Sequence, residues 1–164
     1  MLKIGKVPES VLKRSIIKQI RTKRPEILVG AGVGEDCAAL QLAEDEVFVT
    51  STDPITGTSH DIGSLAVHVT ANDIASSGAE VIGIMLSVLL PEGTEESELK
   101  TIMQQAEEVC EKLNIQTVGG HTEVTGVVNQ TVITATGIGK VKRDSLYIEL
   151  FADLFSLLHY RLKL

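Results

Sequence analysis

Three aspartates, each beside small or turn-forming residues, lie in separate stretches of this sequence: Asp36 in GVGEDCA, Asp53 in TSTDPITG and Asp73 in TANDIASSG. Asp73 follows Asn72 inside an otherwise small and apolar helical pattern, although both residue types favour caps and turns. Carboxylates from separate segments are suited to hold Mg²⁺ that is shared with phosphate oxygens. We therefore predict a metal–phosphate site formed by the three aspartates. Taken singly, Asp36 and Asp53 also fit turn-formers or caps, and Asp73 also fits a solvent-facing helix position.

Two glycine-rich stretches could bring phosphate close to the backbone. The first, GAGVGEDCA, is glycine-rich like a phosphate-binding loop but has no lysine, and the chain lacks both GxxxxGK[ST] and GxGxxG. A triphosphate would then need Mg²⁺ to neutralise its charge. In the second stretch, Gly119 and Gly120 precede His121 and Thr122, so bare backbone amides lie beside two polar side chains. A plain tight turn is the alternative interpretation of this second stretch.

The remaining polar and thiol residues give a weaker signal. His68 and Asn72 are four residues apart, so on a helix they share a face and either hydrogen-bond to each other or line a ligand. A structural histidine is the alternative for His68. Cys37 and Cys110 are expected to be small core residues. No Ser–His–Asp or Cys–His set can be read from the spacing, so no nucleophile is predicted.

The composition is that of a folded, acidic protein. The 164 residues are 43% hydrophobic with a formal net charge of −7, which indicates one domain with a sizeable core. Basic residues are concentrated in the first 24 positions, and the acidic remainder argues against nucleic-acid binding. No apolar run is long enough to span a membrane, and no signal-peptide segment is present. With two cysteines and no metal-like spacing, a cytoplasmic protein with reduced thiols is predicted.

The hydrophobic pattern predicts alternating strands and helices. Helices are expected at residues 8–22, 63–77 and 95–113, and strands at 27–29, 38–42, 47–51, 81–90, 115–118 and 131–137. Asp61 and Thr94 are expected to cap the second and third helices, and Gly78 and Asn114 to end them. The predicted fold class is therefore α/β (α+β), with a mixed β-sheet and the helices on one face.

Residues 144–164 differ in composition from the rest of the chain. Four of the five aromatic residues lie after position 145, in the stretch LYIELFADLFSLLHYRLKL. The spacing fits an amphipathic helix that covers a sheet edge or a partner. It equally fits an appended segment foreign to the parent design, and the composition favours this second interpretation.

The stretches GVGEDCAAL, TSTDPITG, DIGSLAVHVTANDIASSGAE, LLPEG and GGHTEVT together resemble a known superfamily. Their order and spacing over residues 1–143 are similar to the N-terminal half of the aminoimidazole-ribonucleotide-synthetase-related (AIR synthase-like) proteins, especially the hydrogenase-maturation branch. The resemblance implies an N-terminal α/β domain whose sheet pairs with that of a second subunit in a homodimer. It also implies that ATP and Mg²⁺ lie in a cleft near the dimer interface.

The resemblance also assigns roles to individual residues. Asp36, Asp53 and Asp73 match the acids of the family's metal–phosphate motifs, and Asn72 stands beside the third of them. A nucleotide-binding turn is implied for the matching residues Gly119, Gly120, His121 and Thr122. His121 stands where kinase and maturation relatives usually carry an acid. Glu123 is two residues further on and is expected to face the other side of the strand.

The function implied is that of an ATP- and Mg²⁺-binding domain from an ATP-dependent phosphoryl-transfer enzyme. The resemblance stops where residues 144–164 begin, and the family's C-terminal domain is expected to be absent. The chain is therefore expected to be truncated and inactive alone, with the other domain supplied by a separate partner. Two alternatives stay open: a non-catalytic dimerisation module, and a small-molecule kinase resembling thiamine-monophosphate kinase. The acceptor substrate and the catalytic residues are not assigned.

Overall fold

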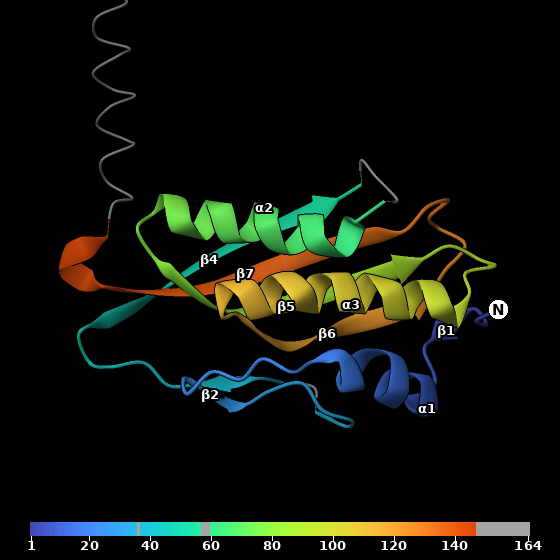
Figure 1. The fold of residues 1–164 in the computed structure, drawn as a ribbon, viewed down its shortest axis with the longest axis horizontal. Coiled ribbons are helices and arrows are strands. Elements are labelled where there is room, and N and C mark those ends of the chain that lie inside the picture. Colours follow the sequence, from blue (N-terminus) through green and yellow to red (C-terminus); the bar gives the residue numbers. More distant parts are fainter. Residues whose placement is uncertain (36, 57–59, 147–164) are drawn as a thin grey trace, which may run out of the picture.

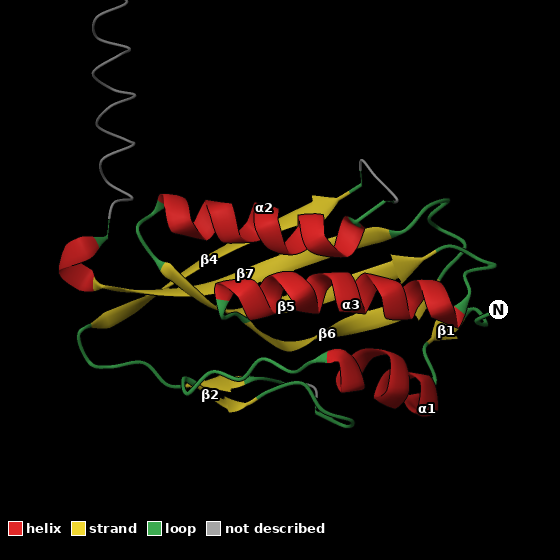
Figure 2. Ribbon diagram, viewed as in Figure 1, coloured by secondary structure: helices red, strands yellow, loops and turns green. Residues whose placement is uncertain are grey.

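A five-stranded mixed sheet with its helices on one face forms the body of the protein (Figures 1 and 2). The computed structural model describes residues 1–35, 37–56 and 60–146. The two long helices are α2 (Ile62–Ser76) and α3 (Glu96–Leu113). In spatial order, the strands of the sheet are β1 (Gly5–Lys6), β6 (Gln116–Val124), β5 (Glu80–Leu90), β7 (Val132–Lys142) and β4 (Glu46–Ile55).

The shorter elements lie beside this sheet. A second ladder pairs β2 (Ile27–Val29) with β3 (Ala39–Leu40) in antiparallel fashion. The first helical segment is a succession of three short pieces, namely α1 (Glu9–Val11), the π-helical turn η1 (Leu12–Ile16) and the 3₁₀ turn η2 (Ile17–Gln19). A further 3₁₀ turn, η3 (Arg143–Ser145), follows β7. No helix in the parts of the chain that the structure describes is both long and apolar enough to cross a membrane.

The core lies between the sheet and the two long helices. Strand β5 runs parallel to β6 and antiparallel to β7, so it is central and its apolar residues are covered. Side chains alternate between the faces of a strand, and Leu86, Val88 and Leu90 on the helix side are at most 3% exposed. The predicted fold class, a mixed sheet with helices on one face, is confirmed.

Of the two predicted helix caps, Asp61 occupies the N-cap position of α2 without a capping hydrogen bond and Thr94 is wrong, whereas both predicted helix ends are confirmed. Asp61 precedes α2 in a left-handed conformation, and its carboxylate accepts a hydrogen bond from Gln105 instead of capping the helix. Thr94 donates its hydroxyl to the Pro91 carbonyl, which leaves Glu95 at the N-cap position. Asn114 ends α3 with a φ of 57°, as a left-handed C-terminal residue does. Gly78, with a φ of 79°, follows α2 in the same way.

Strand β4 is longer than the sequence predicts, because at the edge of the sheet it can include a proline. It continues through Asp53 and Pro54 to Ile55, and Pro54 is paired with Thr134 of β7. Proline lacks an N–H group, so it is tolerated on an edge strand, where one side needs no ladder partner. The pattern of the sequence ended this strand too early, at residue 51.

The sheet face opposite the helices has no described helix packed on it (Figure 2). Its side chains are short polar or apolar groups from three strands, and Phe48 of β4 is 56% exposed. The side chains on this face include Thr52 and Thr136, whose hydroxyls are 2.8 Å apart. We call this surface, formed by the outward residues of β4, β5 and β7, the open face. The residues that define it are Phe48, Thr50, Thr52, Met85, Ser87, Leu89, Thr134, Thr136 and Ile138.

A network of ion pairs joins the segment before β2 to the sheet. Arg24 contacts Glu26 at 2.8 Å and Glu80 at 2.6 Å, and Lys140 contacts Glu26 at 2.8 Å and Glu46 at 3.0 Å. The side chains of Arg24 and Glu26 are 7% and 10% exposed. Burial alone would raise the pKa of Glu26, but hydrogen bonds from Arg24 and Lys140 outweigh it and lower the pKa to about 2. Glu26 is therefore the shared anion of the network.

Replacing Glu26 by Gln is expected to lower the free energy of unfolding by about 2 kcal/mol at neutral pH, because two buried cations lose a shared anion. The loss is moderate because Arg24 keeps Glu80 and Lys140 keeps Glu46. In the wild type, this contribution is present above pH about 4.5 and is lost as the pH falls towards about 2.

Chemical denaturation of wild type and variant between pH 7 and pH 3 measures both effects. A matched control is Asp45→Asn, which removes an exposed partner of Lys142 and is expected to change the stability by less than about 0.5 kcal/mol. Equal losses in the two variants would contradict the role assigned to the buried network.

Candidate functional site

Two of the three predicted metal-binding aspartates lie side by side. Asp53 is on β4 and Asp73 on α2, and Ser51 lies on the same face of β4 as Asp53. The Ser51 hydroxyl donates a hydrogen bond to Oδ2 of Asp73 at 3.2 Å and is 3.5 Å from Oδ2 of Asp53. The helix turn that contains Asp73 is held against β4 by Ile74, which packs on Val49 in a small core cluster.

The proximity of the two carboxyl groups changes their protonation. A hydrogen bond with Asp73 raises the pKa of Asp53, and burial and the charge of Asp73 act in the same direction. Two carboxylates at this separation repel each other, and a cation between them removes that repulsion. Two carboxylates and a hydroxyl are oxygen donors, the kind of ligand that Mg²⁺ prefers. These residues therefore fit the predicted ion.

The third predicted ligand, Asp36, lies outside the described residues. Its neighbours Glu35 and Cys37 are exposed. Among residues 1–35, 37–56 and 60–146, no group of three His, Cys, Asp or Glu side chains is close enough to hold a metal ion. The predicted set of three aspartates is thus represented here by the pair Asp53 and Asp73.

The polar residues beside Asp73 on α2 are at the surface. Asn72 and His68 are both exposed, and no hydrogen bond joins them. The interpretation of His68 as a structural, internally paired histidine does not fit this exposure. Asn72 precedes Asp73 on α2, and its exposed side chain leaves it accessible to a ligand.

The second glycine stretch is part of a strand and is not a turn. Gly119 and Gly120 lie inside β6, beside a register irregularity in its pairing with β5. Gly120 has a φ of +145°, and a Cβ there would lie 2.0 Å from the carbonyl oxygen of Leu86. The prediction of a turn was wrong because glycine serves here to let two strands approach closely, which the sequence pattern alone does not distinguish.

The two glycine-rich stretches meet at one cavity of about 170 Å³. Gly32 and Gly34 line one side, and Gly119 and Gly120 line another. The rest of the wall is mainly apolar and includes the inner side of the first helical segment and residues from β5 and α3: Leu12, Ile16, Ile17, Ile20, Leu86 and Met103. The apolar wall was not predicted as part of a site, since isoleucines at helical spacing are the ordinary signal of a core-facing helix.

His121 and Glu123 contact each other on the surface of β6. Nε2 of His121 is 3.2 Å from Oε2 of Glu123, and both side chains are partly exposed. The expectation that Glu123 faces away was wrong, because residues two apart on a strand point to the same side. Glu123 therefore places a carboxylate next to the position at which His121 stands in the family motif. Thr122, between them, is buried.

Residues 34–141, more than half of the chain, match the family described as AIR synthase related protein, N-terminal domain. The chain belongs to this family. The resemblance read from the sequence is thereby confirmed, and the relatives below agree with its hydrogenase-maturation branch.

Two curated proteins and one solved structure illustrate the similarity. A putative hydrogenase expression/formation protein of Methanocaldococcus jannaschii is 30% identical over 143 residues, which are 85% of this chain and 43% of that protein. Carbamoyl dehydratase HypE of Cupriavidus necator is 34% identical over 66% of this chain and 33% of its own length. The crystal structure of hydrogenase maturation protein HypE in complex with ATP has a TM-score of 0.68 and 26% identity, and covers 87% of this chain and 42% of that one. The chain thus spans less than half the length of the relatives it matches.

In this AIR synthase related domain, the aspartate pair and the glycine strand lie apart. The register places Asp53 opposite Ala135, Ala135 opposite Leu86, and Leu86 opposite Gly120. The four residues therefore form one row across four strands. At about 4.8 Å per strand, Asp53 and Gly120 are roughly 14 Å apart. The strand order thus separates the two halves of the predicted site within this chain.

The two cysteines of the domain lie in different surroundings. Cys110 is fully buried, as predicted, and burial raises the pKa of its thiol to about 12. A thiol with such a pKa stays protonated at neutral pH and is inert. Cys37 is exposed, so the prediction that it is a core residue was wrong.

Proposed function

We propose that this chain is the ATP- and Mg²⁺-binding domain of a hydrogenase-maturation-like, ATP-dependent enzyme. The observation that carries the proposal is the contact between Asp53 and Asp73, with the raised pKa of Asp53. The ATP complex of the similar HypE structure supports nucleotide as the ligand. In this proposal the two carboxylates hold Mg²⁺, which supplies charge neutralisation to the phosphates, and Asn72 lies beside them.

The glycine strand has the second part in this proposal. Backbone amides around Gly119 and Gly120, with His121 and Thr122 beside them, let phosphate approach closely. Glu123 adds a carboxylate next to His121. Because the relatives are more than twice as long as the matched region, the acceptor substrate and the transfer step are proposed to require a further domain, carried in the same protein or by a separate chain.

We further propose that the domain acts as a homodimer that pairs through the open face. One feature supports this: the open face is a broad surface of threonine, serine and apolar side chains without a described helix on it. Ser51 and Asp53 point to the other side of β4, towards α2, so in such a dimer each protomer keeps its own aspartate pair and glycine strand.

Titration calorimetry with Mg·ATP, together with sedimentation velocity, tests this proposal. The wild type is expected to be a dimer that binds Mg·ATP. Phe48→Glu places a charge on the open face and is expected to give a monomer that still binds Mg·ATP, because the aspartate pair lies on the other side of the sheet. The matched control, Val127→Glu, adds the same charge at a site that is 83% exposed in the β6–β7 connection and is expected to change neither property.

Three outcomes would redirect the interpretation. A wild-type dimer that does not bind Mg·ATP would favour a non-catalytic dimerisation module. A Phe48→Glu variant that stays dimeric would contradict pairing through the open face. ATP turnover that depends on an added small-molecule acceptor would favour a kinase.

A further inference from the structure

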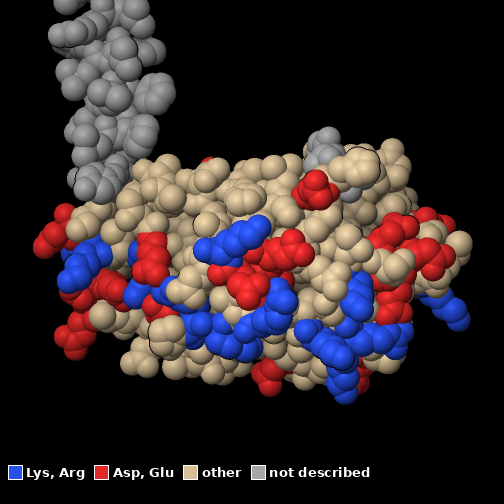
Figure 3. Space-filling view, viewed as in Figure 1, with Lys and Arg blue, Asp and Glu red and all other residues tan. Residues whose placement is uncertain are grey.

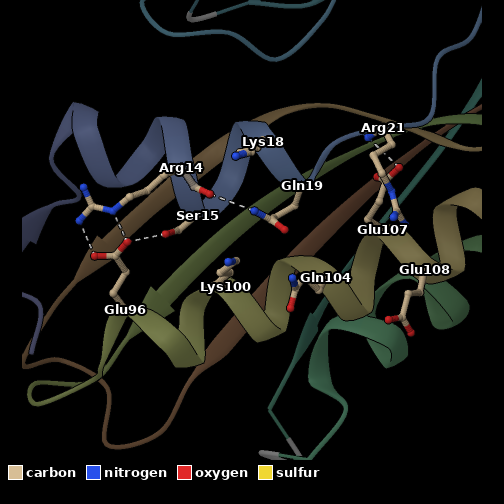
Figure 4. Close-up of a pocket in the computed structure, with 10 residues that line it drawn as sticks. All are labelled: Arg14, Ser15, Lys18, Gln19, Arg21, Glu96, Lys100, Gln104, Glu107 and Glu108. Atoms are coloured by element: carbon tan, nitrogen blue, oxygen red, sulfur yellow. Dashed lines mark hydrogen bonds and ion pairs between the residues drawn. The ribbon is translucent and has the colours of Figure 1, made fainter.

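A polar groove of about 510 Å³ separates the first helical segment from α3 (Figure 4). One wall consists of residues from η1 and η2 and the residues that follow them, and the other consists of the outward side of α3. In the space-filling view, Lys and Arg side chains gather in the lower half of this face, where the first segment lies (Figure 3). The groove is distinct from the glycine-lined cavity, since no residue lines both.

The first end of the groove is fixed by Glu96 of α3. Arg14 binds both oxygens of this carboxylate at 2.5 Å, and the Ser15 hydroxyl donates to it at 2.6 Å. These hydrogen bonds lower the pKa of Glu96 to about 2. Arg14 and Ser15 belong to the π-helical turn η1, so Glu96 holds this irregular turn in place and is itself fully engaged.

The other end of the groove is fixed by Glu107. Its Oε1 accepts hydrogen bonds from the backbone amides of Arg21 and Thr22 and from the Thr22 hydroxyl, at 2.6 to 2.8 Å. The residue is 2% exposed, and its Oε2 is buried without a hydrogen-bond partner. Glu108, one turn of α3 beyond Gln104, also lines the groove and is exposed. Of the three acids that line the groove, Glu96 is therefore engaged and Glu107 is buried, whereas Glu108 stays at the surface.

Two cations between these fixed ends form no ion pair within 4.0 Å in the described part of the chain, namely Lys18 and Lys100. Arg14 is paired with Glu96 and Arg21 with Glu111, and the charge of Lys100 adds only a minor contribution to the lowered pKa of Glu96. Lys18 is on one wall and Lys100 on the facing wall, with no carboxylate between them (Figure 4). Like charges that face each other across a narrow space repel, and an anion between them removes the repulsion.

We propose that this groove is a binding site for a small molecule with a doubly negative group, a phosphate or a pair of carboxylates, held between Lys18 and Lys100. Two ammonium groups match two negative charges. The carboxamide of Gln104 lies in the same groove, and Gln19 is fixed by its hydrogen bond to the Arg14 carbonyl at 2.9 Å. The volume falls within the range usual for small-molecule sites. The fixed ends make the site rigid before the ligand arrives.

Amide chemical shifts recorded by NMR during titration with inorganic phosphate, and separately with malonate, test the proposal at constant ionic strength. Saturable shifts are expected for residues 14–21 and 96–108. Lys18→Gln and Lys100→Gln are each expected to weaken binding about fivefold or more. The matched control is Lys112→Gln, which removes the same charge further along α3 and is expected to change binding by less than about twofold.

Saturation by either anion supports the proposal, and the anion that binds more tightly identifies the class of ligand. Shifts that stay linear with concentration, or equal weakening by all three lysine variants, would overturn it. Shifts confined to residues around Asp73 and Gly119 would also overturn it, because they report the nucleotide site. The groove and the nucleotide site are thus tested by separate signals, and one can fail without the other.

Discussion

Changing Gly120 to alanine is expected to lower the free energy of unfolding by about 3 kcal/mol, whereas the same change at the adjacent Gly119 is expected to alter it by less than about 0.5 kcal/mol. At Gly120, a Cβ would lie 2.0 Å from the Leu86 carbonyl oxygen, and the φ of +145° is one that L-residues rarely adopt. The backbones of β5 and β6 must then separate. At Gly119, the nearest atom to a Cβ is the flexible Cε of Met85, at an ordinary 3.6 Å.

Urea denaturation of the two variants, followed by circular dichroism, measures the difference. The pair is closely matched because the residues are neighbours in one strand and receive the same methyl group. Equal stability of the two variants would show that β5 and β6 do not approach as closely at this point as the structure indicates. Hydrogen exchange of the β5 and β6 amides gives an independent readout of the local separation.

Changing Asp73 to asparagine is expected to have opposite effects on ligand binding and on stability. Binding of Mg·ATP is expected to weaken about 100-fold, because one of the two proposed carboxylate ligands is lost. In the absence of Mg²⁺, the variant is expected to be more stable than the wild type at neutral pH. The reason is that the pKa of Asp53 is raised chiefly by its hydrogen bond with Asp73, and the ionised pair repels.

The pH dependence gives the sign of this effect. A group whose pKa is higher in the folded state than in the unfolded state contributes stability at low pH and loses it as the pH rises through the folded value. The Asp53–Asp73 pair therefore destabilises the free protein above the raised pKa of Asp53. Mg²⁺ is expected to reverse this loss in the wild type and to have a much smaller effect in Asp73→Asn.

Thermal unfolding with and without Mg²⁺, combined with calorimetric titration of Mg·ATP, measures both effects. Glu98→Gln, which removes one exposed acid from α3, is the matched control and is expected to leave binding unchanged. A variant that loses stability and binding together would indicate that Asp73 has a structural role instead. Unchanged binding in Asp73→Asn would remove Asp73 from the proposed metal site.

The long elements could be predicted because their hydrophobic pattern is local. The spacing of Leu99, Ile102, Met103 and Ala106 defines the buried side of α3, and the continuous apolar run of β5 indicates a central strand of the sheet. The irregular turn η1 could not be predicted in this way. It depends on the contact of Arg14 and Ser15 with Glu96, more than 80 positions away in the chain.

The candidate site was predictable in its parts and not in its arrangement. Residue type alone singled out Asp53 and Asp73, and the structure places them in contact through Ser51. By contrast, the roughly 14 Å between Asp53 and Gly120 depends on the strand order, which a single sequence does not specify. The contact of His121 with Glu123 could have been predicted, because side chains two residues apart on a strand point to the same side.

The first helical segment is a partition shared by two cavities. Its side chains Ile16 and Ile20 line the glycine-lined cavity, while Ser15 and Gln19 line the groove on the other side. A displacement of this partition alters the shape of both spaces at once. If a ligand bound in one space changes the affinity of the second space for its own ligand by some factor, the second ligand changes the affinity for the first by the same factor. Any coupling between the two spaces would therefore act equally in both directions.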